Sequence, residues 1–224
     1  FGEMKSTITG IGNAATWNPL AKGTTGTGAT LSNGNLSISN ASASDSTMST
    51  VAMASGKWYM EAVVTYSQDF MFAITSTSNY LPNLYTSATS YTMYVDTSYT
   101  YIKKVSGSSA SDTNLTKPTS GADTLQIAYD ADAGKVWFGK NNTWADSGNP
   151  SAGSGEQYSS ISGPMVFAWR GASVSSASSV ISNFGQKPFK YAVPTGFNAG
   201  ISTHMLPEPT VTDPSAYFGT ILYS

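Results

Sequence analysis

The segment 130–134 (Asp-Ala-Asp-Ala-Gly) invites a calcium interpretation, because closely spaced carboxylates followed by glycine open many calcium-binding loops. Calcium takes roughly six to eight oxygen ligands, and a further acidic residue usually follows downstream. Here the next residues, 135–138 (KVWF), are typical of a strand and carry no carboxylate. Asp and Gly are also the residues that a tight turn requires. The sequence therefore predicts a turn at 130–134 and no metal site.

Catalysis by paired carboxylates, as in glycosidases, would need two acidic side chains facing each other across a cleft. Only Glu61 lies in a strongly predicted core strand, and no second carboxylate is placed to pair with it. The other candidates are Asp69, Asp96, Asp123, Asp146 and Glu156. Serine-type catalysis would have to use His204, the single histidine, and no Gly-x-Ser-x-Gly segment presents a serine. We therefore expect no catalytic residues and no enzyme activity.

Tyrosines gather between residues 80 and 101, interleaved with Ser, Thr and Asn. A tyrosine ring offers a flat apolar face with a polar tip, which suits recognition of a glycan or a protein. Pro82 and a Ser/Thr cluster interrupt any strand in the loop 79–90, so we expect this loop to be exposed. The ligand-binding residues predicted there are Asn79, Tyr80, Asn83 and Tyr85. The alternation of residue types along the predicted strands 91–95 and 99–105 favours core packing for the following four tyrosines: Tyr91, Tyr94, Tyr99 and Tyr101.

The overall composition narrows the possible partners. Charged residues make up 11% of the 224 residues, the net charge is −2, and the pI is about 5.2, which gives no basic surface for nucleic acid. No apolar stretch approaches the roughly 20 residues of a membrane-spanning helix. The chain has no cysteine and one histidine, which excludes disulfides, thiolate metal sites and a two-histidine metal site. We expect no cofactor.

Short β-like runs separated by turn residues, without a sustained helical period, predict about eleven antiparallel strands in a sandwich or barrel. The clearest strands are expected at 35–39, 57–65, 69–75, 91–95, 99–105, 124–129, 135–139, 165–169 and 179–184. Since 69–75 follows 57–65 closely, we expect these two strands to pair. A second turn is expected at Asn141 and Asn142. The predicted core includes Trp58, Phe72, Ile74, Leu125, Ile127, Trp137, Phe138, Phe167 and Phe184.

Three motifs, in the same order along the chain, resemble those of SPRY domains. Residues 55–61 (SGKWYME) are similar to the family's "SGKWYWE" strand, 125–144 to its central hairpin, and 181–189 (ISNFGQKPF) to its closing segment. Met60 stands where the family usually has Trp, and 141–143 replace the family's "KNG" turn. The resemblance implies an all-β fold, an antiparallel β-sandwich of the SPRY or concanavalin A-like jelly-roll type. It also implies a structural role for Glu61 and binding on loops at one end of the sandwich.

The expected organisation is a lead-in at 1–16, the sandwich at 17–202, and a Pro-rich C-terminal extension at 203–224 that connects to a further module or chain. The opening of the sandwich (17–40) and the tail (206–224) resemble those of SPRY-like modules in tailed-phage and prophage virion proteins. This resemblance implies a non-enzymatic module of a tail fibre, head fibre or other surface structural protein. It would be exposed on the virion after assembly in the bacterial cytoplasm, and would serve host-surface binding or particle decoration.

The partners expected from this resemblance are other virion chains, further copies in a homo-oligomer, and a host-surface glycan or protein. Two alternatives stay open at this point. One is a polysaccharide-degrading tail enzyme, and the other is a purely structural spacer.

Overall fold

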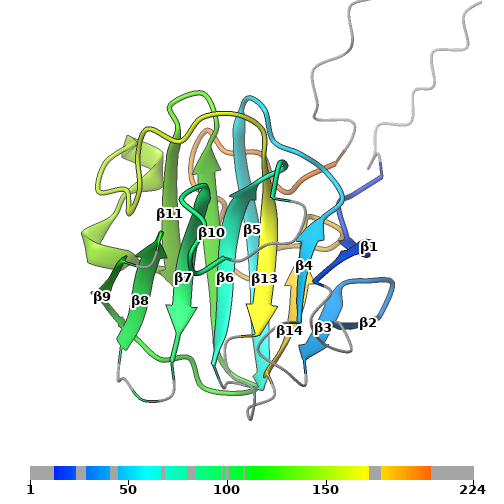
Figure 1. Cartoon of the computed structure of the whole chain (residues 1–224). Helices are drawn as coiled ribbons and strands as arrows, with labels where there is room; N and C mark the ends of the chain where they lie inside the picture. Colours follow the sequence, from blue (N-terminus) through cyan, green and yellow to red (C-terminus); the bar gives the residue numbers. More distant parts are fainter. Residues whose placement is uncertain are drawn as a thin grey trace, which may run out of the picture.

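Two antiparallel sheets pack face to face in the computed structural model, which describes residues 13–23, 29–40, 45–66, 69–79, 84–96, 98, 101–107, 109–171 and 178–202 (Figure 1). The first sheet, which faces the viewer in Figure 1, contains in spatial order β1 (Trp17–Lys22), β4 (Ser46–Ser49), β13 (Met165–Gly171), β6 (Phe70–Ser76), β7 (Ser90–Val95), β8 (Tyr101–Ser106) and β9 (Ser109–Thr116). The second contains β12 (Thr143–Trp144), β11 (Lys135–Lys140), β10 (Thr124–Asp130), β5 (Lys57–Tyr66), β14 (Ser178–Asn183), β3 (Ser37–Asn40) and β2 (Thr30–Ser32). Two short 3₁₀ turns, η1 (Ala145–Ser147) and η2 (Pro150–Ala152), follow β12. The predicted all-β antiparallel sandwich is confirmed.

The core lies between the two sheets and follows the two-residue period of the strands. On β5, for example, Trp58, Met60 and Val64 point inward and are buried, so Met60 takes a core position without disturbing the strand. All nine side chains predicted for the core are buried. Trp137 differs from the others because it packs on the outer side of the second sheet, against Phe197. It is therefore buried by the segment that follows β14 rather than by the opposite sheet.

The expected pairing of strands 57–65 and 69–75 is wrong. β5 pairs with β10 and β14 in the second sheet, whereas β6 pairs with β13 and β7 in the first. At about 3.3 Å per residue, the connection from Tyr66 to Phe70 can span the roughly 10 Å between packed sheets. Both strands are buried along most of their length, so each needs a neighbouring strand on both sides. Each strand finds these neighbours in its own sheet, and the short connection between the sheets allows this as well as a hairpin would.

The turn predicted at 130–134 is confirmed, and its carboxylates have structural roles. Asp130 accepts a hydrogen bond from the backbone N–H of Ala133 at 2.9 Å and forms an ion pair with Lys57 at 3.0 Å. Asp132 accepts from the backbone N–H of Gly56 at 2.9 Å. The second predicted turn, at 141–142, has left-handed backbone at both positions, with φ of 51° and 63°. Asparagine tolerates this conformation, which a tight two-residue hairpin turn requires.

Asp123 joins the loop before β10 to the turn after β11. Its carboxylate accepts hydrogen bonds from the backbone N–H of Thr119 at 2.7 Å and from Nδ2 of Asn141 at 2.6 Å, and Lys140 Nζ lies 3.6 Å away. Burial raises the pKa of this carboxyl, but the two hydrogen bonds and the Lys140 ammonium outweigh burial, so the pKa is lowered from its ordinary value of 3.8. The ionised form of Asp123 is therefore stabilised in the folded chain.

Acidification is expected to remove the stability that Asp123 contributes. Because its pKa is lower in the folded than in the unfolded chain, the contribution is present above about pH 4 and disappears as the pH falls through the folded pKa. Denaturant unfolding of the wild type and of Asp123→Asn should therefore differ near pH 7 and converge near pH 2. A difference of equal size at both pH values would contradict this prediction.

Candidate functional site

A row of side chains crosses the outer face of the first sheet. In register, Lys103 on β8 lies opposite Tyr94 on β7, Tyr94 opposite Met71 on β6, and Met71 opposite Arg170 on β13. Residues paired across neighbouring strands point to the same face of a sheet. The neighbour of Met71 in β6, Phe72, belongs to the core between the sheets, so these four side chains face outward. We call Lys103, Tyr94, Met71 and Arg170 the outer row.

Residues 84–90 cover the part of the outer face next to this row. Leu84 is completely buried, and its carbonyl accepts a hydrogen bond from Thr92 Oγ1 at 3.2 Å. Asn79 Nδ2 lies 2.7 Å from Thr75 Oγ1 and within 3.3 Å of the Ser90 hydroxyl. These contacts attach the two described ends of the loop to β6 and β7. This loop buries Met71 in the outer row and leaves Tyr94 and Arg170 half-buried.

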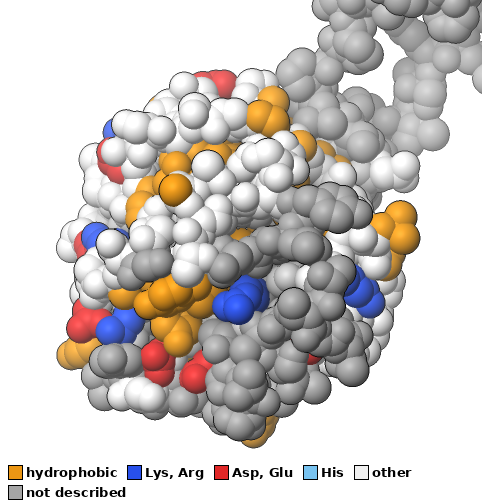
Figure 2. Space-filling model, viewed as in Figure 1, with side chains coloured by type: hydrophobic (Ala, Val, Ile, Leu, Met, Phe, Trp, Pro, Cys, Tyr) orange, Lys and Arg blue, Asp and Glu red, His pale blue; other side chains and the backbone are white. Residues whose placement is uncertain are grey.

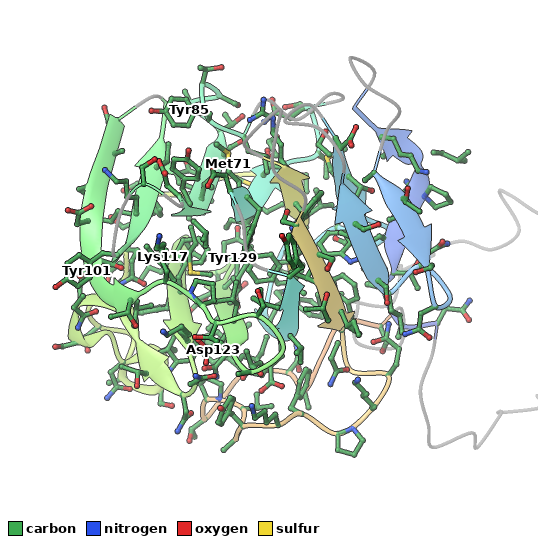
Figure 3. The ribbon with its side chains drawn as sticks, turned by 90° about the horizontal axis from the view of Figure 1, so that it is seen from below. Met71, Tyr85, Tyr101, Lys117, Asp123 and Tyr129 are labelled. Atoms are coloured by element: carbon green, nitrogen blue, oxygen red, sulfur yellow. The ribbon has the colours of Figure 1, made fainter. Side chains whose placement is uncertain are left out.

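Tyr85 lies over the outer row. Its ring meets the ring of Tyr94 edge to face, with centroids 6.0 Å apart, and both rings are half-buried. Met71, only 2% exposed, forms the floor beneath them. Figure 3 shows Met71 and Tyr85 close together on the outer side of the first sheet, away from Asp123. Figure 2 shows hydrophobic side chains gathered over β6 and β7, with a basic side chain beside them and acidic ones along their lower edge.

Among the described residues, Arg170 is the cation of this site that has no carboxylate close by to offset the cost of its burial. Its side chain is half-buried, and one guanidinium nitrogen lies 4.0 Å from Met71 Sδ. Within the described ranges it has no carboxylate at 4.0 Å or closer, whereas Lys103 pairs with Asp112 at 3.6 Å. Burial lowers the pKa of Arg170, and the neighbouring Tyr94 acts in the opposite direction. The guanidinium nevertheless remains charged at neutral pH, because the ordinary pKa of arginine lies far above neutrality.

One edge of the site is acidic, because Asp69 and Asp96 lie beside the row, directly before β6 and after β7. Burial, followed by the charges of Asp96 and Asp69, raises the pKa of Tyr94. The tyrosine hydroxyl therefore stays protonated at neutral pH. The site thus offers a guanidinium and two aromatic rings, with carboxylates along one edge.

Two of the four predicted ligand-binding residues, Asn79 and Tyr85, lie among the described residues, and they have different roles. Tyr85 belongs to the site. Asn79 holds the loop, because its side-chain nitrogen lies within hydrogen-bonding distance of four hydroxyls, those of Thr75, Ser87, Thr89 and Ser90. Tyr80 and Asn83 lie outside the described residues, and their binding role stays a prediction.

The expectation that the later tyrosines pack in the core holds only in part. Tyr91 packs against Tyr158 in the core. Tyr94 instead faces outward, because it lies an odd number of residues from Tyr91 along the strand. Tyr101, the first residue of β8, is 44% exposed. Tyr99 lies outside the described residues.

Glu61 has the structural role that the family resemblance implies. It lies on the outer face of the second sheet, where its carboxylate accepts hydrogen bonds from the backbone N–H groups of Lys190 at 2.8 Å and Tyr191 at 2.9 Å, and from the Tyr59 hydroxyl at 2.8 Å. Burial raises the pKa of Tyr59, so its hydroxyl remains a donor. Glu61 thereby fixes the segment that covers Trp137.

No group of three or more His, Cys, Asp or Glu side chains in the described ranges could hold a metal ion. The helical segments of the described chain include none long and apolar enough to cross a membrane. His204 lies outside the described residues.

The sequence matches no protein-family model and no curated protein. The structure, in contrast, is similar to the PSpry domain of TRIM65, with a TM-score of 0.57 and 10% sequence identity over 76% of this chain and 92% of that chain. It is also similar to the SPRY domain of human HERC1, with a TM-score of 0.56 and 12% identity over 77% of this chain and 99% of that chain. Identities this low show the fold alone. The chain therefore has a SPRY-like β-sandwich fold.

Proposed function

We propose that this chain is a non-enzymatic binding module of a phage virion surface protein, such as a tail fibre or head fibre, that attaches to a host-surface ligand or decorates the particle. The proposal combines the SPRY-like fold with the similarity of segments 17–40 and 206–224 to modules of tailed-phage proteins. The observation that carries it is the outer row. Two tyrosines and an arginine without a carboxylate partner among the described residues meet there.

The contacts of the acidic residues support binding rather than hydrolysis. Glu61, Asp123, Asp130 and Asp132 each accept hydrogen bonds from backbone N–H groups. Asp146 accepts from the backbone N–H of Asn114 and pairs with Lys104 at 3.3 Å. A carboxylate that serves as general acid or base must be able to exchange a proton with substrate, and hydrogen bonds to backbone donors oppose this.

The low charge content determines how such a module would bind. Affinity would come from contact with aromatic rings and from neutral hydrogen bonds, together with one guanidinium. Individual sites of this size are weak, so useful attachment would come from many copies on one particle. A homo-oligomer assembled with other virion chains would provide those copies.

Replacing Tyr85 by alanine should weaken attachment of the multimerised chain to host bacteria at least tenfold. The loss of a half-buried ring at the site removes contact area, while Leu84 and Asn79 continue to hold the loop. Flow cytometry with a fluorescent multimer on a panel of bacterial strains measures attachment, and thermal unfolding checks the fold.

Tyr66→Ala is the matched control, because Tyr66 is 50% exposed but lies on β5 in the second sheet. It should bind like the wild type. Equal attachment by Tyr85→Ala and the wild type would place the binding surface elsewhere. Release of oligosaccharide from the cells would instead favour the enzyme alternative.

A further inference from the structure

We infer that the outer row binds a saccharide that carries an isolated carboxylate, and that Arg170 is the group that receives this carboxylate. This inference rests on the proposed function and deepens it by naming the chemical class of the ligand. It follows from three features of the site: the uncompensated guanidinium, its position beside two aromatic rings, and the acidic groups along one edge of the row.

The first feature is the environment of Arg170. Removing a cation from water costs free energy, and folded proteins usually offset this cost with a carboxylate. Among the described residues, Arg170 has no carboxylate within 4.0 Å, although Lys103 at the other end of the row has Asp112. A guanidinium presents a planar fork of donors that matches a carboxylate with two parallel hydrogen bonds. A ligand carboxylate would therefore provide the missing partner.

The second feature is the spacing along the row. Arg170 and Tyr94 are separated by Met71 alone, which corresponds to two strand spacings or about 10 Å. One ligand can therefore lie on the rings of Tyr94 and Tyr85 while its carboxylate reaches Arg170. The C–H face of a sugar ring packs on tyrosine, and the tyrosine hydroxyls can hydrogen-bond to sugar hydroxyls.

The third feature, the acidic residues beside the row, favours a saccharide with isolated carboxylates over a densely charged anion. Asp96 follows Val95 on β7 and Asp69 precedes Phe70 on β6, so both lie along one edge of the row beside Tyr94, where they would repel a second negative charge. A densely charged polyanion is therefore disfavoured, whereas a carboxylate separated from the next by neutral sugar units is accommodated.

An acidic protein partner is disfavoured by the distribution of apolar surface. The strongly exposed large hydrophobic side chains of the described chain are Leu20, Tyr66 and Tyr101, on β1, β5 and β8. They are scattered over both sheets, outside the hydrophobic group at the outer row, and a stable protein interface needs a larger contiguous apolar centre than this group.

The test uses surface polysaccharide extracted from the bacteria to which the chain attaches, both native and after chemical reduction of its carboxylates to alcohols. Calorimetry or biolayer interferometry with the full chain should show at least tenfold weaker binding of the reduced polymer. Arg170→Gln should weaken binding of the native polymer by a similar factor and change binding of the reduced polymer little. Arg170→Lys, which keeps the charge but not the planar fork, should fall between the two.

Lys187→Gln is the control for net charge, because Lys187 is an exposed cation beyond β14 at the second sheet, and it should bind like the wild type. Equal affinity of the wild type for native and reduced polymer would overturn the inference without needing any variant to fold. If Tyr85→Ala still abolished attachment in that case, the proposed function would stand and only the ligand class would be wrong. If Tyr85→Ala attached normally, the proposed site itself would fail.

Discussion

Replacing Glu61 by glutamine is expected to lower the free energy of unfolding by about 3 kcal/mol, because the buried carboxylate accepts three hydrogen bonds. Glutamine keeps one acceptor oxygen but turns an NH₂ group toward a backbone N–H that the carboxylate had bound. The result is a buried donor without an acceptor at Lys190 or Tyr191. Urea unfolding measures the loss, and amide hydrogen exchange at residues 190 and 191 should accelerate in the variant.

The matched control for this exchange is Glu156→Gln. Glu156 also carries a carboxylate, but its side chain is partly exposed and makes an ion pair with Lys135 at 3.1 Å, so its loss should cost less than about 1 kcal/mol. Similar stability losses in the two variants would contradict the role assigned to Glu61.

Replacing Gly134 by alanine should destabilise the chain by about 3 kcal/mol, for two separable reasons. Gly134 has a φ of +62°, a conformation that costs an L-residue about 1 kcal/mol. In addition, a Cβ at this position would collide with the carbonyl oxygen of Ile161 and lie 3.0 Å from its nitrogen. The collision would disrupt the hydrogen bond from the Ile161 N–H to the Gly134 carbonyl.

Gly34→Ala isolates the contribution of backbone conformation. Gly34 has the same φ of +62°, and a Cβ there would meet nothing within 4 Å. We expect this control to lose about 1 kcal/mol in the same unfolding measurement. Equal losses in both variants would mean that the contact with Ile161 does not constrain the turn.

Features of the fold that depend on nearby residues could be predicted from the sequence. The turn at 130–134 forms because Asp130 bonds to a backbone N–H three residues away and Gly134 supplies the left-handed conformation, and both signals are local. The partner of β5 could not be predicted in the same way. Strands of similar composition can pair with several others, so pairing is decided by the packing of the whole sandwich.

The residues of the candidate site likewise differ in whether nearby sequence could predict their role. Tyr85 could be predicted because Pro82 and the surrounding Ser and Thr residues indicate a loop. Arg170 and Tyr94 could not, since they are distant in sequence and come together only when β13, β6 and β7 are neighbours. The sequence around Arg170 (MVFAWRG) resembles a buried strand throughout, and so gives no sign that one face lies at the surface.

The contact between Glu61 and the segment after β14 also bears on how this surface can change over evolution. The carboxylate holds positions 190 and 191 through backbone N–H groups, which every residue except proline possesses. The side chains at these positions can therefore be exchanged without losing the attachment of the segment. This stretch can therefore vary in sequence at little cost to the sandwich beneath, much as an antibody varies its loops.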